Sequence, residues 1–277
     1  MFQNIEYNIY SIIMKIGIIG LGVVGNAILQ SFKKHNLDPK VYDKYQNRGQ
    51  FNDTLDTDII FLCLPTPFDP KMDEYDKSSI HEVCQKLSEN HYNGLVVLKS
   101  TVEPGTSTSL SEKYSLNIIH NPEFLKARTA LQDFENQNHI ILGTTPKLSQ
   151  NFLDMIVLFY KKNYPNALIS ICSSEISETV KLACNSFYAV KIQYFNEIYF
   201  LCQKLNIDYP KVRELMLLNG WIHPYHTLVP GTDGFISYGG ACFPKDTNAL
   251  NSYMRLKGTP HSVLSAAIEE RNQMRNN

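Results

Sequence analysis

A glycine-rich segment near the end of the chain contains a cysteine with possible chemistry. The sequence YGGACFPKD, residues 238–246, places Cys242 between two glycines and a Pro-Lys-Asp run. Glycines permit close approach of the backbone, and a proline restrains the chain that follows. A thiol near a basic side chain can act as a nucleophile, although a cysteine is more often a small buried hydrophobic residue. Cys242 is therefore either a nucleophile or a core residue.

Other polar side chains occur where an apolar core would not require them. Lys181 and Asn185 are four residues apart in an apolar helical segment, so they share one face of the helix. A partly buried lysine can polarise an oxyanion, and an asparagine can donate a second hydrogen bond. A solvated polar stripe is the alternative. Thr101 in STVEPGT, Glu123 in NPEFL and Asp246 complete this candidate set.

The segment IIGLGVVGN predicts a dinucleotide site. It places Gly20, Gly22 and Gly25 between a strand pattern and a helix pattern, where they allow a tight turn, close approach of a pyrophosphate and helix packing. Asp43 ends the next strand pattern, where a carboxylate can bind a ribose hydroxyl and disfavour a 2′-phosphate; Arg48 weakens this preference. A glycine turn without ligand is the alternative. We expect NAD to contact Gly20, Gly22, Val23, Val24, Gly25, Asp43, Arg48, Pro65, Thr66, Thr101 and Lys245.

Short β-branched runs alternate with amphipathic helical segments in the first part of the chain. This alternation predicts an α/β fold with a Rossmann-like, doubly wound parallel sheet. The expected strands are 15–20, 40–43, 58–65, 94–100, 118–121, 139–143 and 168–172, and the clearest helices are 23–35 and 77–90.

The second part of the chain has a helical pattern. Residues 178–206 contain no Gly or Pro and are apolar around most of the helix, which predicts a long helix buried on several sides. Ser173 or Ser174 can cap it, and Glu175 and Glu178 suit its first turn. Such a helix suits a domain connector or the core of a homodimer. Further helices are expected at 209–219, 246–256 and 261–274.

The expected domains are therefore an N-terminal extension at 1–13, an NAD-binding domain at 14–172 and an all-helical domain with a long central helix at 173–277. The extension is expected because Met14 directly precedes the first strand pattern.

Composition excludes several classes of protein. The 277 residues have a net charge of −1, whereas nucleic-acid binding requires clustered basic residues. No apolar run is long enough to span a membrane. The six cysteines show no metal-binding spacing, so we expect no metal and free thiols in a reducing, cytoplasmic compartment. His223 and His226 are expected to be surface or packing residues.

Together, GGACFPKD, STVEPGT, NPEFL and the ETVKLACN helix resemble the UDP-glucose/GDP-mannose dehydrogenase family, over residues 14 to about 260. The resemblance implies oxidation of a nucleotide-sugar primary alcohol to a carboxylate, with two NAD per substrate and UDP-glucose as the first expectation. Cys242 would form a thiohemiacetal and then a thioester, Lys181 and Asn185 would stabilise oxyanions, and Asp246 with Thr101 would hold the hydrolytic water. Glu123 would assist proton transfer. The implied substrate contacts are Phe124, Leu125, Lys181, Asn185, Gly239, Gly240 and Cys242.

The sequence also departs from the family pattern. The family continues into a second Rossmann-like domain that holds the nucleotide, and residues 1–277 are not expected to form such a domain. Ala127 replaces a second acid after NPEFL, and Trp221, Ile222 and His223 stand where the family has an arginine motif. The resemblance therefore supports the chemical core more strongly than the nucleotide contacts.

Two other functions remain open. A β-hydroxyacid dehydrogenase also combines an NAD domain, a helical domain and a Lys-x-x-x-Asn pair, but it does not need Cys242. A catalytically altered NAD-binding subunit that needs a partner is the second alternative. The presence of all six candidate catalytic residues is evidence against this loss of activity.

Overall fold

The computed structural model describes residues 14–275, so the expected extension at 1–13 lies outside the described residues. These residues form two compact units. The sheet unit comprises 14–66 and 77–179, and the helical unit comprises 67–76 and 180–275.

The sheet unit contains seven strands in the order β2-β1-β3-β6-β7-β8-β9. Ile18 of β1 packs into one hydrophobic cluster and the adjacent Ile19 into another, because successive strand residues point to opposite faces. The strands are β1 (Ile16–Ile19), β2 (Lys40–Tyr42), β3 (Ile59–Leu62), β6 (Leu95–Leu98), β7 (Asn117–His120), β8 (His139–Thr144) and β9 (Leu168–Ser173).

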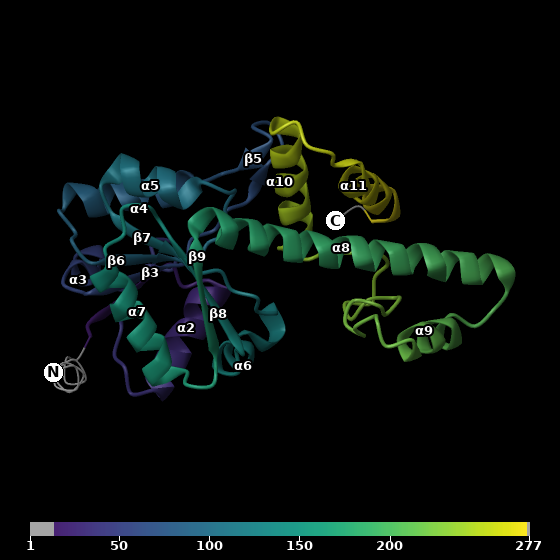
Figure 1. Cartoon of the computed structure of the whole chain (residues 1–277), viewed down its shortest axis with the longest axis horizontal. Coiled ribbons are helices and arrows are strands. Elements are labelled where there is room, and N and C mark those ends of the chain that lie inside the picture. The colour runs from purple at the N-terminus through teal and green to yellow at the C-terminus, as the bar shows by residue number, and fades with distance from the viewer. Residues whose placement is uncertain (1–13, 276–277) are drawn as a thin grey trace. The chain divides into compact units, whose positions relative to one another are not determined.

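Helices cover both faces of this sheet. Phe32 and Phe159, from α2 and α7, pack into the first cluster, whereas Val83 and Leu110, from α4 and α5, pack into the second. The expected α/β, doubly wound architecture is confirmed (Figure 1). The helical segments are α2 (Val23–Lys34), α3 (Phe51–Leu55), α4 (Ser78–Glu89), α5 (Thr106–Tyr114), η1 (Ala127–Thr129), α6 (Ala130–Glu135) and α7 (Gln150–Asn163).

One strand pair differs from the expected parallel arrangement. β8 pairs with β7 in the antiparallel direction, with Ile119 opposite Thr144, while the other neighbouring pairs are parallel. The connection from β7 contains only η1 and α6, and α6 packs against α2. A parallel neighbour would need a connection that returns the chain to the end of the sheet where β7 begins. This connection does not return there, so β8 runs in the reverse direction.

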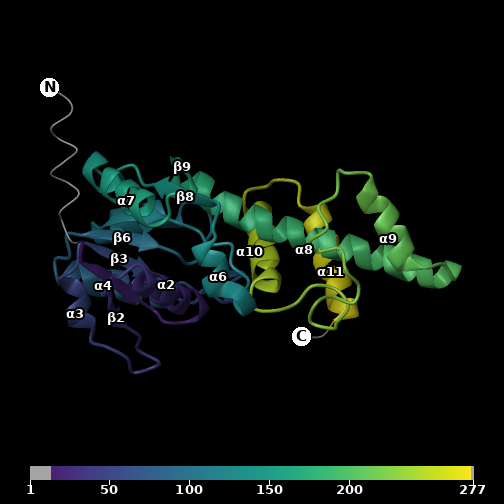
Figure 2. The ribbon, with the colours of Figure 1, turned by 90° about the horizontal axis from the view of Figure 1, so that it is seen from below.

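The helical unit is built on α8 (Ser174–Leu205), whose first turns belong to the sheet unit. It also contains α9 (Tyr209–Leu218), α10 (Phe243–Leu256) and α11 (Ser262–Met274). α10 and α11 lie beside α8 and run across its direction (Figures 1 and 2). The four helices agree with the expected segments within a few residues at each end.

The expectation that this unit is entirely helical was incomplete. A short antiparallel hairpin, β4 (Phe68–Asp69) and β5 (Glu74–Tyr75), belongs to it and lies beside α10 (Figure 1). Tyr75 packs in a small core with Leu182 and Ala249. The sequence does not indicate this hairpin because its packing partners lie more than a hundred residues away.

α8 contributes many buried side chains, but one of its apolar faces is exposed in the single chain. Phe187, Tyr194 and Leu201 are each at least half exposed. They are spaced seven residues apart, so they form one apolar stripe along the helix.

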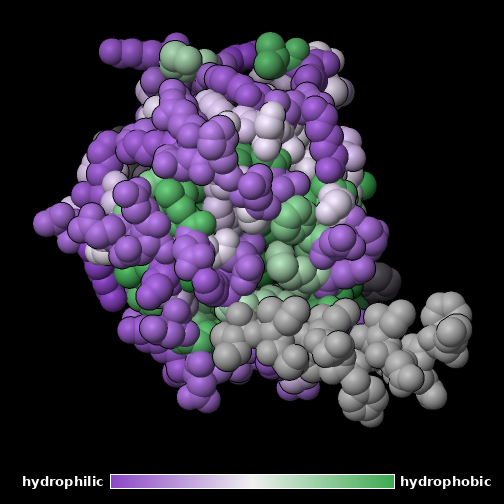
Figure 3. Space-filling view, turned by 90° about the vertical axis from the view of Figure 1, so that its left-hand side faces the viewer, coloured by the Kyte–Doolittle hydropathy of each residue, from purple (hydrophilic) through white to green (hydrophobic). Residues whose placement is uncertain are grey.

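The surface is mostly polar in the view of Figure 3, where hydrophobic areas appear between hydrophilic side chains. Within residues 14–275, no helix combines the length and the apolar character needed to cross a membrane.

Candidate active site

The glycine turn joins β1 to α2 in the sheet unit. Gly20 has a φ of +90°, and a Cβ there would lie 2.4 Å from the carbonyl oxygen of Cys63. A Cβ at Gly25 would lie 1.9 Å from the Gly20 carbonyl oxygen, whereas one at Gly22 would meet nothing within 4 Å. The outer glycines are therefore required by packing, and the central one leaves open space at the N-terminus of α2.

A cavity of about 370 Å³ adjoins this turn. Among the expected NAD contacts, those that line it are Gly20, Gly22, Val23, Val24, Asp43 and Pro65. Gly25, Arg48, Thr66 and Thr101 belong to the same unit but not to the lining, and Lys245 belongs to the helical unit. The sequence analysis missed several lining residues: Tyr42, Lys44, Tyr45, Gln46, Leu64, Ser79, Glu82, Val83 and Lys86.

Asp43 organises the polar end of the cavity. Its carboxylate accepts hydrogen bonds from the backbone N–H groups of Leu21 (2.6 Å), Tyr45 (2.9 Å) and Gln46 (2.8 Å). This negative charge therefore fixes the glycine turn to the turn after β2. The open backbone at Gly22, the helix N-terminus and the apolar wall fit a dinucleotide, with its pyrophosphate over Gly22 and a ribose near Asp43.

Three charged side chains also line this cavity. Lys44 donates to both oxygens of Glu82 at 3.0 Å, and Lys86 donates to the same carboxylate at 2.8 Å. These bonds lower the pKa of Glu82. The negative charge of Glu82 therefore offsets the positive charges of Lys44 and Lys86, which line the same cavity as Asp43.

Thr101 lies after β6, in a buried polar region at the ends of the parallel strands. Its carbonyl oxygen accepts a hydrogen bond from the Thr66 hydroxyl at 2.7 Å. Lys99 donates to the side-chain oxygen of Asn121 at 2.8 Å, and Tyr160 donates to the same oxygen at 2.5 Å. Lys99 and Asn121 were missed, although a polar residue directly after a buried strand is a signal for this edge of the sheet.

Glu123 follows β7 in the same unit. Its carboxylate accepts the backbone N–H of Leu125 at 2.7 Å, which holds the loop in a tight turn. The side chain of Leu125 packs against the core, and Phe124 is exposed.

In the helical unit, Cys242 is the N-cap residue of α10 and is exposed. This observation argues against a core role for the thiol. Lys181 and Asn185, by contrast, are buried on α8, so they are not a solvated stripe. A thiolate at Cys242 would lie at the positive end of the α10 dipole.

Asp246 lies in the first turn of α10 and is fully buried. Its Oδ2 accepts a hydrogen bond from Asn185 Nδ2 at 2.6 Å, and its Oδ1 accepts one from Lys245 Nζ at 2.6 Å. The phenol of Tyr75 also donates to Oδ1. The structure thus brings Asn185, Lys245 and Asp246 together, and it adds Tyr75, which no sequence motif indicated.

The two loop glycines have different surroundings. A Cβ on Gly240 would meet nothing within 4 Å, and its φ is +77°. A Cβ on Gly239 would lie 2.3 Å from the guanidinium of Arg275, which also donates to Asp233 at 2.9 Å. Open space for a substrate therefore lies beside Gly240, while Arg275 fills the space beside Gly239.

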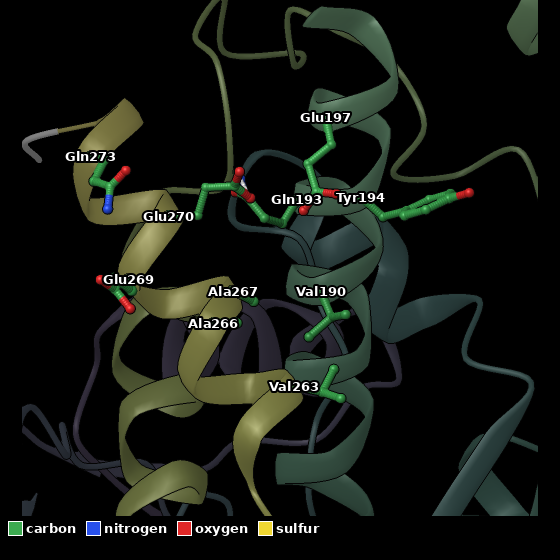
Figure 4. A pocket seen from close by; sticks show the side chains of 10 residues that line it. All are labelled: Val190, Gln193, Tyr194, Glu197, Val263, Ala266, Ala267, Glu269, Glu270 and Gln273. Carbon is green, nitrogen blue, oxygen red and sulfur yellow. Dashed lines mark hydrogen bonds between the residues drawn. The ribbon is translucent and has the colours of Figure 1, made fainter. Parts of the chain in front are cut away.

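A second hollow lies between α8 and α11 within the helical unit (Figure 4), with a volume of about 540 Å³. Gln193 donates to Glu270 at 2.7 Å across it. Burial and the nearby Glu270 carboxylate raise the pKa of Glu197. No candidate catalytic residue lines this hollow.

The candidate catalytic residues are divided between the two units. Thr101 and Glu123 belong to the sheet unit, whereas Lys181, Asn185, Cys242 and Asp246 belong to the helical unit. A glycine turn between a strand and a helix, with a carboxylate after the second strand, defines a dinucleotide-binding α/β unit.

Comparisons with known proteins identify the family. Residues 41–162 match the NAD binding domain of the UDP-glucose/GDP-mannose dehydrogenase family, and residues 175–273 match the central domain of the same family. The chain belongs to the UDP-glucose/GDP-mannose dehydrogenase family. The expected family and its NAD-binding domain are thereby confirmed.

Curated relatives include two UDP-glucose 6-dehydrogenases. The Campylobacter jejuni protein is 28% identical over 92% of this chain and 71% of its own length. The Rickettsia bellii protein is 33% identical over 79% of this chain and 50% of its own length. The chain therefore spans between 50% and 71% of the length of these relatives.

Two solved structures share the fold. A UDP-glucose dehydrogenase from Pyrobaculum islandicum has a TM-score of 0.83 and 23% identity, covering 94% of this chain and 68% of that one. A 3-hydroxyisobutyrate dehydrogenase from Mycobacterium tuberculosis has a TM-score of 0.71 and 12% identity, covering 93% of this chain and 92% of that one. The same two-part fold therefore also occurs in a protein of about the length of this chain.

Proposed function

We propose that the chain is an NAD-dependent nucleotide-sugar dehydrogenase that oxidises the C6 alcohol of a sugar, most directly UDP-glucose, to the carboxylate. Family membership supports the reaction class, and the names of the curated relatives support this substrate. The observation that carries the proposal is an exposed thiol at a helix N-terminus, followed four residues later by a buried carboxylate that an α8 asparagine binds.

The proposed residues have complementary roles. The glycine turn and Asp43 would hold NAD, which would supply the hydride acceptor for both oxidations. Cys242 adds to the aldehyde as a thiolate, and the resulting thiohemiacetal loses two electrons to become a thioester. Lys181 and Asn185 stabilise the oxyanions that form on the sugar oxygen. Water then cleaves the thioester to release the carboxylate and the free thiol.

Hydrolysis requires a positioned water and a group that accepts its proton. We assign the water to Asp246 and Thr101, and the proton transfer to Glu123. Phe124, Leu125, Gly239 and Gly240 are proposed to contact the sugar. The open space beside Gly240 supports a substrate contact there more directly than beside Gly239.

The test is the number of NADH molecules formed per UDP-glucose, measured for the wild type and for Cys242→Ser. We expect two NADH per sugar from the wild type. The serine variant should stop after the first oxidation, with aldehyde-level product detected by mass spectrometry. A single NADH per sugar in the wild type, or full turnover by the serine variant, would contradict the covalent route.

A two-electron dehydrogenase of small β-hydroxyacids is the second candidate. The similarity to the 3-hydroxyisobutyrate dehydrogenase fold over 92% of that chain supports it. It predicts one NADH per hydroxyacid and no effect of Cys242→Ser. NAD binding without turnover of either substrate class would favour the remaining alternative, a subunit that needs a partner to bind the sugar nucleotide.

We also propose a homodimer through α8. The apolar stripe of Phe187, Tyr194 and Leu201 supports it because a seven-residue spacing suits helix pairing. Light scattering should give twice the chain mass, and Tyr194→Lys should reduce it to one chain. A monomeric wild type would reject the dimer. The six free cysteines support a reducing, cytoplasmic location.

A further inference from the structure

The buried carboxylate of Asp246 requires partners. The side chain has no exposure to solvent, and a carboxylate removed from water is costly unless it is paired and hydrogen-bonded. Three side chains supply donors: Asn185 to Oδ2, and Lys245 and Tyr75 to Oδ1. Asn185 and Lys245 already have expected roles, but Tyr75 has none.

Tyr75 interacts with this group through both its hydroxyl and its ring. The hydroxyl donates to Asp246 Oδ1, while the ring centroid lies 4.7 Å from Lys245 Nζ. A ring face attracts an ammonium group, so the phenol holds both members of the Lys245–Asp246 ion pair. The hydroxyl fixes the carboxylate, and the ring fixes the lysine that binds it.

The hairpin that carries Tyr75 is attached to α10 by other contacts. Ser252 donates to Asp73 Oδ1 at 2.6 Å, and Arg255 donates to Asp73 Oδ2. The ring of Tyr75 is itself buried against Leu182 and Ala249. Removing only the hydroxyl should therefore leave the hairpin in place.

The donor pattern restricts what Asp246 can still bind. A carboxylate offers about four lone-pair sites, two on each oxygen. Within the described part of the chain, Tyr75 and Lys245 occupy both lone-pair sites of Oδ1, and Asn185 occupies one of the two sites of Oδ2. One acceptor site therefore remains, on Oδ2 beside Asn185.

We propose that Tyr75 is a positioning residue that orients the Asp246 carboxylate, so that its single remaining acceptor site on Oδ2 holds the water that cleaves the thioester. The consequence for hydrolysis rests on the proposed function. The orientation of the carboxylate by the phenol does not depend on it.

Tyr75→Phe tests the role in catalysis. We expect kcat to fall about tenfold, the KM for UDP-glucose to stay within about threefold, and an initial burst of NADH to appear as thioester accumulates. An unchanged kcat, or a lower kcat without a burst of NADH, would overturn the proposal.

Asp73→Asn is the matched control. It weakens the attachment of the hairpin to α10 but removes no partner of Asp246. It should lower the melting temperature without lowering kcat or producing a burst of NADH. If Asp73→Asn reproduces the kinetic change of Tyr75→Phe, the effect comes from docking of the hairpin and the positioning role is wrong.

A double-mutant cycle separates this proposal from the proposed function. Unfolding by denaturant is measured for the full chain, Tyr75→Phe, Asp246→Asn and the double variant at pH 7. A hydrogen bond to the carboxylate predicts a non-additive change of about tenfold or more in the unfolding equilibrium constant. Additive changes overturn the proposal. If no nucleotide sugar is oxidised, the proposed function fails, and the cycle alone still decides whether Tyr75 orients Asp246.

Discussion

Glu178 provides a pH-dependent test of how the sheet unit holds the start of α8. Its carboxylate accepts the backbone N–H groups of Gly105 at 2.6 Å and Ser107 at 2.8 Å, at the N-terminus of α5. Burial nevertheless raises the pKa of Glu178 to about 7 from an ordinary value of 4.5. The folded state therefore binds its proton more tightly than the unfolded state does.

The sign of the effect follows from linkage. Protonated Glu178 stabilises the folded state relative to ionised Glu178. This contribution is fully present below pH 4.5, and it is lost as the pH rises through the folded-state pKa of about 7. A difference of about 2.5 pKa units corresponds to about 3 kcal/mol. Glu178→Gln removes this titration. Relative to the protonated wild type it costs about 1 kcal/mol, because the amide nitrogen cannot accept a backbone N–H.

The assay is chemical denaturation of the wild type and Glu178→Gln between pH 4.5 and 8.5. We expect the variant to be slightly less stable at pH 4.5 and more stable by about 2 kcal/mol at pH 8.5, with the curves crossing between about pH 5 and 6. Subtracting the free energies of unfolding of the two proteins cancels the contribution of every other titrating group, because both proteins contain these groups. A difference that does not vary with pH, or one of the opposite sign, would refute the reasoning.

The other predictions concern the dinucleotide cavity and the hollow of Figure 4. Gly25→Ala should lower the free energy of unfolding by about 3 kcal/mol or more in a denaturant titration, because its Cβ would overlap a backbone oxygen. Gly22→Ala should fold normally but weaken NAD binding by about tenfold in calorimetry; equal stability of the two variants would contradict the packing argument. Glu82→Gln removes the negative charge that pairs with Lys44 and Lys86, so these lysines can bind the 2′-phosphate of NADP. The Kd for NADP should fall several-fold relative to the Kd for NAD, and an unchanged ratio of the two Kd values would contradict this. Glu197→Gln removes a repulsion with Glu270 and should raise the melting temperature by about 1–2 °C at pH 8, whereas a lower melting temperature would be evidence against that repulsion.

Local patterns were sufficient for much of the architecture. Gly20 and Gly25 are required by contacts within one turn and with Cys63, which follows the neighbouring strand β3. The glycine spacing between a strand pattern and a helix pattern is local, so the strand–turn–helix unit is visible in the sequence. The long helix is visible because uninterrupted helical periodicity is a local property. The antiparallel β8 could not be predicted, because strand direction depends on the path of the chain between strands rather than on side-chain pattern.

The candidate site divides in the same way. Residue types, motif spacing and the resemblance to the family together selected Cys242, Lys181, Asn185 and Asp246 as candidates, because the proposed covalent oxidation needs a thiol, oxyanion donors and a carboxylate. The sequence did not show that Cys242 is exposed at a helix N-terminus while Asp246 is buried four residues later.

Tyr75 shows most clearly what only the tertiary structure decided. It is 171 positions from Asp246 in the sequence and lies in a hairpin with no recognisable motif. A hydrogen bond depends on distance and direction in space, and no spacing rule connects residues whose contact is created by the packing of a hairpin on a helix. The sequence by itself thus determined the family and the dinucleotide turn, and it supplied the candidates for the reactive groups. The tertiary structure decided which side chains surround the buried carboxylate and how many acceptor sites remain on it.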